Sequence, residues 1–393
     1  MIDHWKTCKL GDLISINSNN LKRGQFDWIN YIDIKSVSSG TYGDPTHYRI
    51  GSEPSRAKRV LKEGDTVISS VRPNLKAFFF CQNMPENAVA STGFAVLSPI
   101  KIDTRFLYYL TTNDNYIEYL VKSCTGSAYP AFNTRVIEDS IVRIPESIEE
   151  QRAIASILSA LDDKIELNLQ MNKTLEEMAM ALYKHWFIDF GPFKDGKFVE
   201  SELGMIPEGW EVKKLNQISI SHNKLRKPIS TREREKIKGN YPYYGATKIL
   251  DYIDHFNLNG EYILLAEDGT VKTEKDTPFL QFIQGKFCVS NHAHILSGMN
   301  CYGNNFLFLA LSNTNVLPFI TGAVQLKINK QNLDQMQFIV GSEVKMLEFE
   351  SKVKPLFAKM KSNEFENQNL ISQRDSLLPK LISGEISVDQ NFE

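Results

Sequence analysis

Two long stretches of the chain repeat one pattern at alternating steps of four and three positions. In the first stretch eight of the ten positions are apolar and the two central ones are asparagines: Ile154, Leu158, Leu161, Ile165, Asn168, Asn172, Leu175, Ala179, Leu182 and Trp186. The second stretch lies 195 positions later, with both asparagines in register: Phe349, Val353, Leu356, Met360, Asn363, Asn367, Leu370, Arg374, Leu377 and Leu381. This spacing is the heptad pattern of helices that pack along a seam. The sequence therefore predicts two long helices that form a coiled coil with each other.

The first helix is predicted to span residues 147–189. Ser147 is followed three positions later by Glu150, the spacing of a capping box, in which two side chains satisfy free backbone N–H groups at the start of a helix. Gly191-Pro192 ends the pattern, because neither residue favours a continuing helix.

The second helix is predicted to span residues 342–384 and contains Pro355 and Pro379. Proline lacks the backbone N–H that the interior of a helix uses, and its ring clashes with the preceding turn. We therefore expect the second helix to kink or to begin late, near Pro355, unlike the first helix.

The four central asparagines, Asn168, Asn172, Asn363 and Asn367, have two interpretations. A long helix tolerates occasional polar residues, and in that case these four have no special role. Alternatively, a buried asparagine pairs best with another asparagine and so specifies the register of two helices, at some cost in stability. The recurrence of both asparagines at the same spacing favours the register role.

The repeat extends beyond the helices. At offsets between 195 and 205 positions, Trp5 recurs as Trp210, residues 64–68 as 260–264, residues 91–98 as 290–297, and Thr125-Gly126 as Thr321-Gly322. A period near 200 residues is too long for a solenoid repeat. It indicates one duplicated unit, a globular head followed by a long helix. The remaining boundaries that we predict are residues 1–146 for head 1, 190–209 for a linker, 210–341 for head 2 and 385–393 for a C-terminal tail.

Both heads mix short strands with short helical segments. In head 1, residues 77–80 and 94–97 are candidate strands and Thr104 to Leu120 is a candidate helix, which predicts the α+β class. An antiparallel helix pair is favoured, because a parallel pair would require the linker to span roughly 50 Å, nearly its full reach. The expected fold is two pseudo-twofold-related globular domains separated by an antiparallel coiled coil of two long helices.

Composition changes this prediction little. The chain has 393 residues, 42% hydrophobic and 23% charged, with a formal net charge of −2. Nucleic-acid-binding proteins often have a basic excess, so any DNA-binding surface must be local or shared with a basic partner. The five cysteines include no C-x-x-C pair, which argues against a disulfide framework and suits a reducing cytosol. We find no signal peptide and no membrane-spanning stretch, and so expect a cytoplasmic protein.

The motifs of several enzyme classes do not occur in the sequence. It contains no G-x-x-x-x-G-K-[ST] segment, no G-x-G-x-x-G after a strand and no N-P-P-Y-type motif of adenine methylation. His292 and His294 would face the same side of a strand, but no further ligand at a suitable spacing accompanies them. A hydrogen-bonding pair on the domain surface is therefore favoured over a metal site. We predict no catalytic residue and no metal.

Matching loops in the two heads contain side chains suited to DNA. The candidates in head 1 are Arg72, Asn74, Lys76, Ser91 and Thr92. Those in head 2 are Lys248, Asp268, Lys272, Asn291, His292 and His294. Arginine, asparagine, lysine and histidine are suitable donors to guanine, adenine and phosphate. Different side chains on one scaffold favour readers of two different sequences, but ordinary turns with solvated charges explain the same residues equally well.

Several segments resemble the specificity subunits of type I restriction–modification systems. The most specific are Glu149-Glu150-Gln151-Arg152-Ala153-Ile154-Ala155, Leu203-Gly204-Met205-Ile206-Pro207-Glu208-Gly209-Trp210 and Leu377-Leu378-Pro379-Lys380-Leu381-Ile382-Ser383-Gly384-Glu385-Ile386. Residues 91–97 and 290–294 are similar to segments of the family's recognition domains. The resemblance covers the whole chain.

This resemblance implies a function. Each head would be a target recognition domain for one half of an asymmetric, bipartite site in double-stranded DNA, with the helices as a ruler between them. The helices would also dock two modification (methyltransferase) subunits, and restriction (translocase and nuclease) subunits would join for cleavage. S-adenosylmethionine, ATP and Mg²⁺ would belong to those partners. The chain itself would hold no cofactor and catalyse no reaction.

Two other functions stay open. Related enzymes that cut on both sides of their site use similar specificity subunits, and the neighbouring genes would separate that case. A coiled-coil scaffold without a DNA function would show no sequence-dependent DNA binding, even with methyltransferase partners present.

Overall fold

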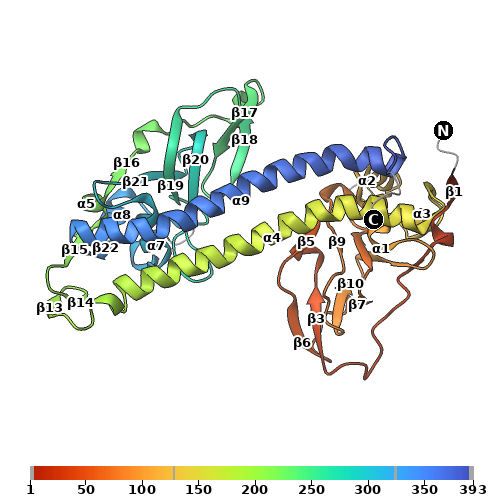
Figure 1. The fold of residues 1–393 in the computed structure, drawn as a ribbon, viewed down its shortest axis with the longest axis horizontal. Helices are drawn as coiled ribbons and strands as arrows, with labels where there is room; N and C mark the ends of the chain where they lie inside the picture. The colour runs from red at the N-terminus through yellow and green to blue at the C-terminus, as the bar shows by residue number, and fades with distance from the viewer. Residues whose placement is uncertain (1–3, 127–128, 323–324, 389–393) are drawn as a thin grey trace. The chain divides into compact units, whose positions relative to one another are not determined.

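The computed structural model describes residues 4–126, 129–322 and 325–388. The chain divides into two compact units: unit 1 is residues 1–167 with 366–393, and unit 2 is residues 168–365. Each unit combines one head of short strands and helices with half of each long helix (Figure 1). The α+β class predicted from the sequence is confirmed.

Head 1 contains two four-stranded sheets, with strand orders β2-β11-β8-β9 and β6-β3-β10-β7. Only the β3–β10 pair is parallel. The elements are β1 (Trp5–Lys9), β2 (Ile14–Ile16), β3 (Trp28–Ile32), β4 (Val37–Ser38), β5 (Thr41–Tyr42), β6 (Thr46–Arg49), β7 (Ala57–Val60), β8 (Thr66–Ser69), β9 (Phe78–Phe80), β10 (Ala88–Ser91), β11 (Phe94–Pro99), α1 (Thr104–Thr112), α2 (Asp114–Lys122), α3 (Arg135–Glu138) and β12 (Ile141–Pro145). The single helix predicted from Thr104 to Leu120 is therefore two helices, and Asn113 caps the second by accepting from the Tyr116 N–H at 3.0 Å.

Head 2 contains one six-stranded sheet of order β16-β21-β19-β20-β17-β18, in which only the β17–β20 pair is parallel. Its elements are β15 (Glu211–Lys214), α5 (Leu215–Ile218), β16 (Ser219–Ser221), α6 (Thr231–Arg234), β17 (Lys238–Tyr244), β18 (Ile249–Ile253), β19 (Leu258–Ala266), β20 (Leu280–Val289), β21 (Ala293–Gly298), α7 (Asn304–Ser312), α8 (Lys330–Asp334) and β22 (Gln337–Val340). The segment expected as a linker before this head forms a hairpin of β13 (Phe198–Ser201) and β14 (Gly204–Pro207).

The two heads share one topology. β2, β11 and β8 pair in the same order as β16, β21 and β19, and the β1–β12 ladder matches the β15–β22 ladder. The long strand β19 takes the place of β7 and β8, and β20 takes the place of β9 and β10. In head 1 these strands are interrupted by residues 61–65 and 81–87, where Gly64 and Asn83 turn the backbone with φ of 82° and 55°. The predicted duplication is confirmed.

The long helices are α4 (Ile148–Phe187) and α9 (Glu343–Ser383). The expected late start of the second helix near Pro355 is wrong, because α9 is helical from Glu343 through both prolines. Pro355 and Pro379 lie on the exposed side of the helix. Water can hydrogen-bond the carbonyl that each proline leaves without a partner there, so the proline is tolerated.

Within unit 1 the two helices run antiparallel. Arg374 Nη1 donates to Asp162 Oδ1 at 2.8 Å, and Asn367 Nδ2 donates to the backbone oxygen of Ile165 at 3.3 Å. As residue numbers rise along α4, the numbers of the contacting residues on α9 fall. This order confirms the antiparallel prediction.

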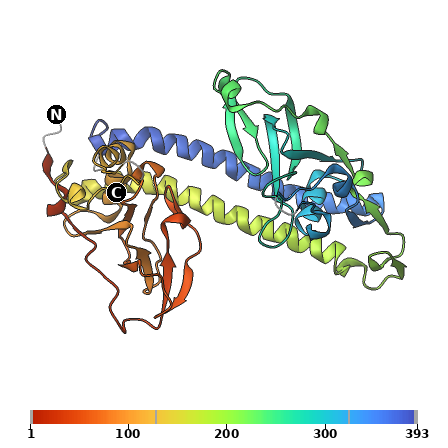
Figure 2. The same cartoon turned by 180° about the vertical axis from the view of Figure 1, so that it is seen from behind.

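Within unit 2 the helices are also antiparallel. Asn363 Nδ2 donates to Asn172 Oδ1 at 2.8 Å, and Asn172 Nδ2 donates to the backbone oxygen of Met360 at 3.1 Å. Farther along, the rings of Phe187 and Phe349 pack edge to face at 4.9 Å. Figure 2 shows α4 and α9 side by side from behind, as Figure 1 does from the front.

The predicted seam is the buried face of both helices. Each of its positions is buried or partly buried, and Asn168 and Asn363 are 0% exposed. Asn172 and Asn363 pair directly, and Asn367 donates to the backbone oxygen of Ile165. This placement agrees with a register role, which stays a prediction.

The start of α4 uses only half of the predicted capping box. Ser147 Oγ accepts from the Glu150 N–H at 3.3 Å, as expected. The Glu150 carboxylate instead accepts from Trp5 Nε1 at 3.0 Å and lies 3.3 Å from His4 Nε2. Glu150 is only 4% exposed, so it ties the first strand of the head to the helix.

The apolar core of each unit extends from the head into the helix pair. In unit 1, Phe106 and Leu120 belong to the same buried cluster as Leu158 and Leu381. In unit 2, Phe306 of α7 packs against Phe187 at a ring distance of 5.0 Å. Head and helix halves therefore share one apolar core within each unit.

Candidate nucleic-acid interface

Three loops of head 1 meet at one end of the β2-β11-β8-β9 sheet: residues 70–76 after β8, residues 91–93 from the last residue of β10 to the start of β11, and residues 129–132. The backbone N–H and the hydroxyl of Ser70 both donate to the Gly93 oxygen, at 2.9 and 2.8 Å. The Arg72 N–H donates to the Pro130 oxygen at 2.8 Å. These loops form the three-loop site of head 1.

Head 2 brings the matching residues 267–272, 290–292 and 325–328 together in the same way. The Glu267 N–H donates to the His292 oxygen at 2.9 Å, and the Gly269 N–H donates to the Leu326 oxygen at 3.1 Å. The backbones of Asp268 and Lys327 form an isolated β-bridge, as those of Val71 and Ala131 do in head 1. The two loops predicted in each head are thus adjacent, and a third loop joins them.

Arg72 stacks on an exposed aromatic ring. Its guanidinium carbon lies 4.4 Å from the ring centre of Tyr129, which is 70% exposed. The backbone φ of Arg72 is 49°, a left-handed conformation that residues other than glycine seldom adopt. Asn74, two residues on, is exposed. A planar cation, an aromatic ring and an amide together suit contact with nucleic-acid bases.

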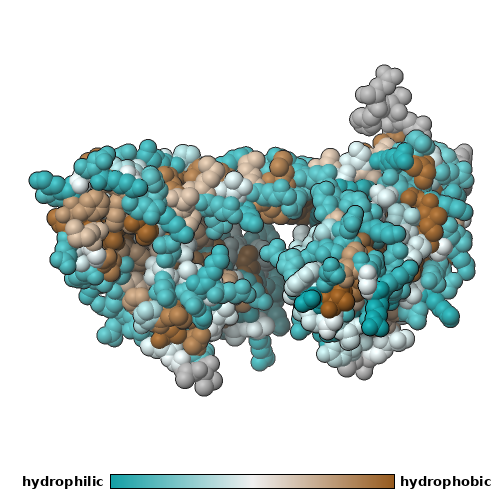
Figure 3. Space-filling model, turned by 90° about the horizontal axis from the view of Figure 1, so that it is seen from below, coloured by the Kyte–Doolittle hydropathy of each residue, from teal (hydrophilic) through white to brown (hydrophobic). Residues whose placement is uncertain are grey.

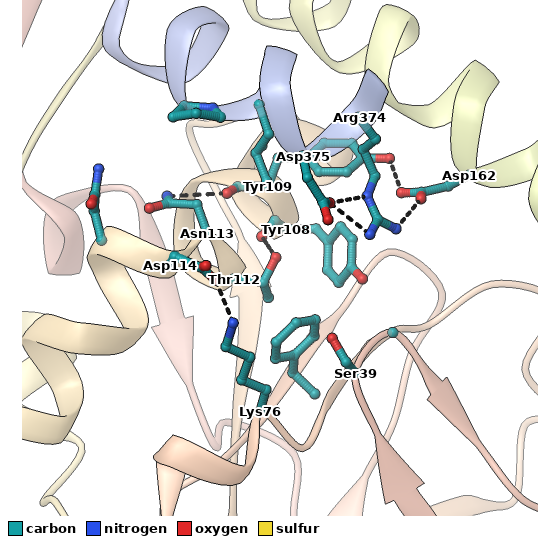
Figure 4. A pocket seen from close by; sticks show the side chains of 15 residues that line it. Ser39, Lys76, Tyr108, Tyr109, Thr112, Asn113, Asp114, Asp162, Arg374 and Asp375 are labelled. Atoms are coloured by element: carbon teal, nitrogen blue, oxygen red, sulfur yellow. Dashed lines mark hydrogen bonds and ion pairs between the residues drawn. The ribbon is translucent and has the colours of Figure 1, made fainter. Parts of the chain in front are cut away.

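Lys76 is engaged within head 1. Figure 4 shows its ammonium directed at Asp114, and Nζ lies 2.7 Å from Oδ1. Both residues line a cavity of about 340 Å³. A contact between Lys76 and DNA phosphate would therefore have to replace this ion pair.

The far wall of the cavity is the helix pair. Arg374 donates to Asp162 and Asp375, each at 2.8 Å, and the Tyr109 hydroxyl donates to Asp162 at 2.7 Å (Figure 4). Burial acts to lower the pKa of Arg374, but hydrogen bonds to the two carboxylates raise it above its ordinary value. This network fixes the position of α1 of the head on the helices.

Glu267 is the centre of an ionic cluster in head 2. Its carboxylate is 13% exposed, accepts from Arg226 Nη1, and lies 3.2 Å from Lys327 Nζ and 3.8 Å from His294 Nδ1. Burial acts to raise the pKa of Glu267, but the hydrogen bonds from Arg226 and Lys327 hold it below its ordinary value. Glu267 is therefore an anion that positions two cations at the three-loop site.

His292 and Asp268 form a pair at the surface of the same site. His292 Nδ1 lies 2.9 and 3.0 Å from the two carboxylate oxygens of Asp268. Asn291 beside it is exposed, and its backbone oxygen accepts from Arg226 Nη1 at 3.3 Å. Lys272 pairs with Asp276 four residues along the chain.

His294 is buried, so the prediction of a surface pair with His292 is wrong. It is 1% exposed, its Nε2 lies 2.8 Å from the Ile328 oxygen, and its Nδ1 lies 2.9 Å from Asn223 Nδ2. Burial lowers the pKa of His294, and because the side chain is buried it is not available to DNA. Strand β21 begins between the two histidines, which places only the second inside the head.

The remaining candidates differ in exposure. Ser91 is 0% exposed, and its hydroxyl accepts from the Gly93 N–H at 3.3 Å, so it shapes the turn. Thr92 is exposed in the same loop. Lys248 is exposed in the turn between β17 and β18, outside the three-loop site. DNA contact by the exposed candidates stays a prediction.

Four residues of the candidate interface were not predicted from the sequence: Tyr129, Arg226, Glu267 and Lys327. Tyr129 and Lys327 belong to the third loop, which follows the repeated Thr-Gly pairs. That repeat was the available signal, because a glycine recurring at the same place in both heads indicates a conserved turn. Both glycines have a φ of 88°, in the region that favours glycine.

Charge is distributed unevenly along the chain. Head 1 contains 17 Lys and Arg against 15 Asp and Glu, and head 2 contains 15 against 11. The helices, linker and tail contain 13 against 21. Both heads therefore have a small basic excess although the chain is slightly acidic, and this distribution favours the heads over the helices as sites of contact with DNA.

The surface shown in Figure 3 is mainly hydrophilic, with separate apolar patches. Exposed apolar side chains on the long helices include Leu167, Leu169, Met178, Phe365 and Ile371.

In the part of the chain that the structure describes, no group of three or more His, Cys, Asp or Glu residues could hold a metal ion. None of the helices described has the length and apolar character needed to cross a bilayer.

Known proteins are similar to this chain over most of its length. The family described as "Type I restriction modification DNA specificity domain" matches residues 2–177 and 207–341. The type I restriction enzyme HindI specificity subunit of Haemophilus influenzae is 26% identical over 97% of this chain and 99% of its own length. The MjaIX specificity subunit of Methanocaldococcus jannaschii is 28% identical over 73% of this chain and 70% of its own. The crystal structure of a type I restriction–modification S subunit from M. genitalium has the same fold, with a TM-score of 0.55 and 14% identity over 96% of each chain.

Proposed function

The chain belongs to the family of type I restriction–modification DNA specificity domains, and from this premise we propose how it selects DNA. Each head binds one half of a bipartite, asymmetric site in double-stranded DNA through its three-loop site. The observation that supports this proposal is the recurrence of one backbone arrangement with different side chains. Identical scaffolds with different chemistry suit two half-sites of different sequence.

In the same proposal the helix pair docks two modification subunits, and restriction subunits join the complex for cleavage. The exposed apolar side chains of α4 and α9 support docking, because large apolar side chains on a surface helix mark sites of protein contact. Residues 147–209 contain 12 Asp and Glu against 6 Lys and Arg, which favours a basic partner surface. S-adenosylmethionine, ATP and Mg²⁺ bind to these partners, and the chain is a non-catalytic subunit in the cytoplasm.

The proposal is tested by expressing the chain with its modification subunits in a host that lacks other methylation. Methylation-aware sequencing of that host should show a bipartite motif that depends on both proteins. A hybrid in which a relative's first head replaces residues 1–146 should change one half of the motif and keep the other. The chain expressed without modification subunits is the control.

A complex that assembles but methylates no defined sequence would contradict the DNA function and favour a scaffold. A hybrid that changes both halves of the motif would contradict the assignment of one head to each half-site.

A further inference from the structure

His292 is an exposed side chain held by a partly buried carboxylate and by backbone hydrogen bonds. Its ring is 50% exposed, whereas its partner Asp268 is 23% exposed. The backbone on either side is fixed, because the His292 oxygen accepts from the Glu267 N–H at 2.9 Å and the His292 N–H donates to Ser290 Oγ at 3.3 Å. A side chain fixed in this way loses little freedom on binding, which suits it to sequence readout.

The pairing determines which nitrogen of the ring carries the proton. An ionised carboxylate only accepts hydrogen bonds, so Nδ1, which lies 2.9 and 3.0 Å from the Asp268 oxygens, must be the donor. In a neutral imidazole the other nitrogen is then an acceptor. Among the residues that the structure describes, no hydrogen-bond partner of Nε2 is found.

An acceptor at this position distinguishes the bases of the major groove. Adenine N6 and cytosine N4 present amino donors, whereas guanine O6 and thymine O4 present acceptors. An unprotonated Nε2 therefore accepts a hydrogen bond from adenine or cytosine and is repelled by the acceptor oxygen of guanine or thymine. The equivalent residue of head 1 is Gly93, which has no side chain for such a contact.

We propose that Asp268 is a positioning residue that fixes the tautomer of His292, so that head 2 selects adenine or cytosine at one position of its half-site. This inference rests on the proposed function, and it specifies the chemistry of that same site. Arg226 and Lys327, held by Glu267, flank this contact and supply the cations that approach the DNA backbone.

The test uses the complete complex of this chain with its modification subunits. Initial rates of methylation are measured on duplexes that carry each base at each position of both half-sites. The wild-type complex should prefer an amino base, adenine or cytosine, at one position of the head 2 half-site. The ratio of rates that expresses this preference should fall about tenfold in His292→Ala. Asp268→Asn keeps the ring but no longer fixes its tautomer, so guanine and thymine should become acceptable at the same position.

A matched control lies in the same head but outside the three-loop site. Asp254 and His255 form a similar exposed pair, with Oδ1 and Nδ1 2.7 Å apart. Asp254→Asn and His255→Ala should leave every base preference unchanged. Preferences in the head 1 half-site, retained by all four variants, show that each variant is folded and assembled.

Four results would overturn the inference. The first is that Asp268→Asn keeps the wild-type base preference. The second is that the preference removed by His292→Ala is one for guanine or thymine. The third is that His292→Ala slows methylation of all duplexes equally, as loss of a phosphate contact would. His292→Ala with no effect on any duplex would also overturn it. A wild-type complex without any sequence preference would instead contradict the proposed function itself.

Discussion

Ser70 follows strand β8 in head 1, and Glu267 follows the matching strand β19 in head 2. The Ser70 hydroxyl makes one neutral hydrogen bond, to the Gly93 oxygen. The Glu267 carboxylate binds two cations, Arg226 and Lys327. Yet the backbone N–H groups of Ser70 and Glu267 donate to equivalent carbonyls, both at 2.9 Å. The loops are therefore positioned by the backbone, which leaves their side chains free to differ.

The helix contacts of the two units differ in a parallel way. Unit 1 joins α1 to the helices through the polar network of Tyr109, Asp162 and Arg374. Unit 2 joins α7 to the helices through Phe306, whose ring lies 5.0 Å from that of Phe187 and 6.2 Å from that of Phe349, beside hydrogen bonds from α7 to Glu350. One duplicated scaffold thus stays intact with two different kinds of contact, and the variants below test how far the two units depend on them.

The largest expected effect is the loss of stability in Phe349→Ala. Phe349 is 0% exposed, so its removal should lower the free energy of unfolding of unit 2 by about 3–5 kcal/mol. In unit 1, Tyr109→Phe removes only one hydrogen bond to a carboxylate and should cost about 1.5–3 kcal/mol. Native-state hydrogen exchange assigns each loss to its unit. An equal or larger cost for Tyr109→Phe would show that the polar network is the stronger of the two.

The next effect is the loss of the ionic cluster in Glu267→Gln. This change leaves Arg226 and Lys327 without their anion and should cost about 1–3 kcal/mol, whereas Ser70→Ala should cost about 0.5–1.5 kcal/mol. The folded pKa of Glu267 is below its ordinary value. Its stabilisation is therefore complete above the unfolded pKa of about 4.3 and is lost as pH falls through the folded pKa.

Urea unfolding between pH 7 and pH 3 measures this difference. The gap between wild type and Glu267→Gln should be constant at neutral pH and should close only in acid, while Ser70→Ala should show no such closure. A gap that is independent of pH over the whole range would mean that the charge of Glu267 is not the stabilising feature.

Arg72→Ala tests whether the stacked arginine of head 1 contacts a base. If it does, the change should weaken DNA binding by about 1–3 kcal/mol and relax one position of the head 1 half-site only. Tyr129→Ala removes the ring on which Arg72 stacks and should relax the same position to a smaller extent. Both effects are measured by binding to a set of duplexes with single base changes. Unchanged selectivity in Arg72→Ala would exclude this residue as the base contact of head 1.

The smallest effect is expected for the lysines of the two sites. Lys76 and Lys272 pair with Asp114 and Asp276, so phosphate contact must compete with an ion pair. Each change to alanine should weaken binding to all sequences alike and lower the salt slope by at most about one. Lys9, paired with Asp139 away from the loops, is the control. A change in base preference in either variant would show a contact with a base instead of phosphate.

Much of the fold was predictable from the sequence because it depends on local periodicity. The heptad spacing of residues such as Leu158, Asn172 and Val353 gave the buried face of both helices, and the recurrence of segments gave the duplication. The interpretation failed where a partner distant in sequence decided the outcome. The Glu150 carboxylate accepts from Trp5 instead of completing the capping box with Ser147. Pro355 is tolerated because its side of α9 faces solvent.

The sequence by itself determined the two heads, the helix seam and the pairs of loops that contain the exposed candidates. Only the tertiary structure decided which side chains reach the surface and which bind one another. His292 and His294 are two residues apart, yet one is exposed and the other buried. Lys76 pairs with Asp114 and Lys327 pairs with Glu267, and each partner is distant in the sequence. A repeating pattern encodes which face of a helix or strand is buried, whereas each polar contact depends on residues that are brought together only when the chain folds.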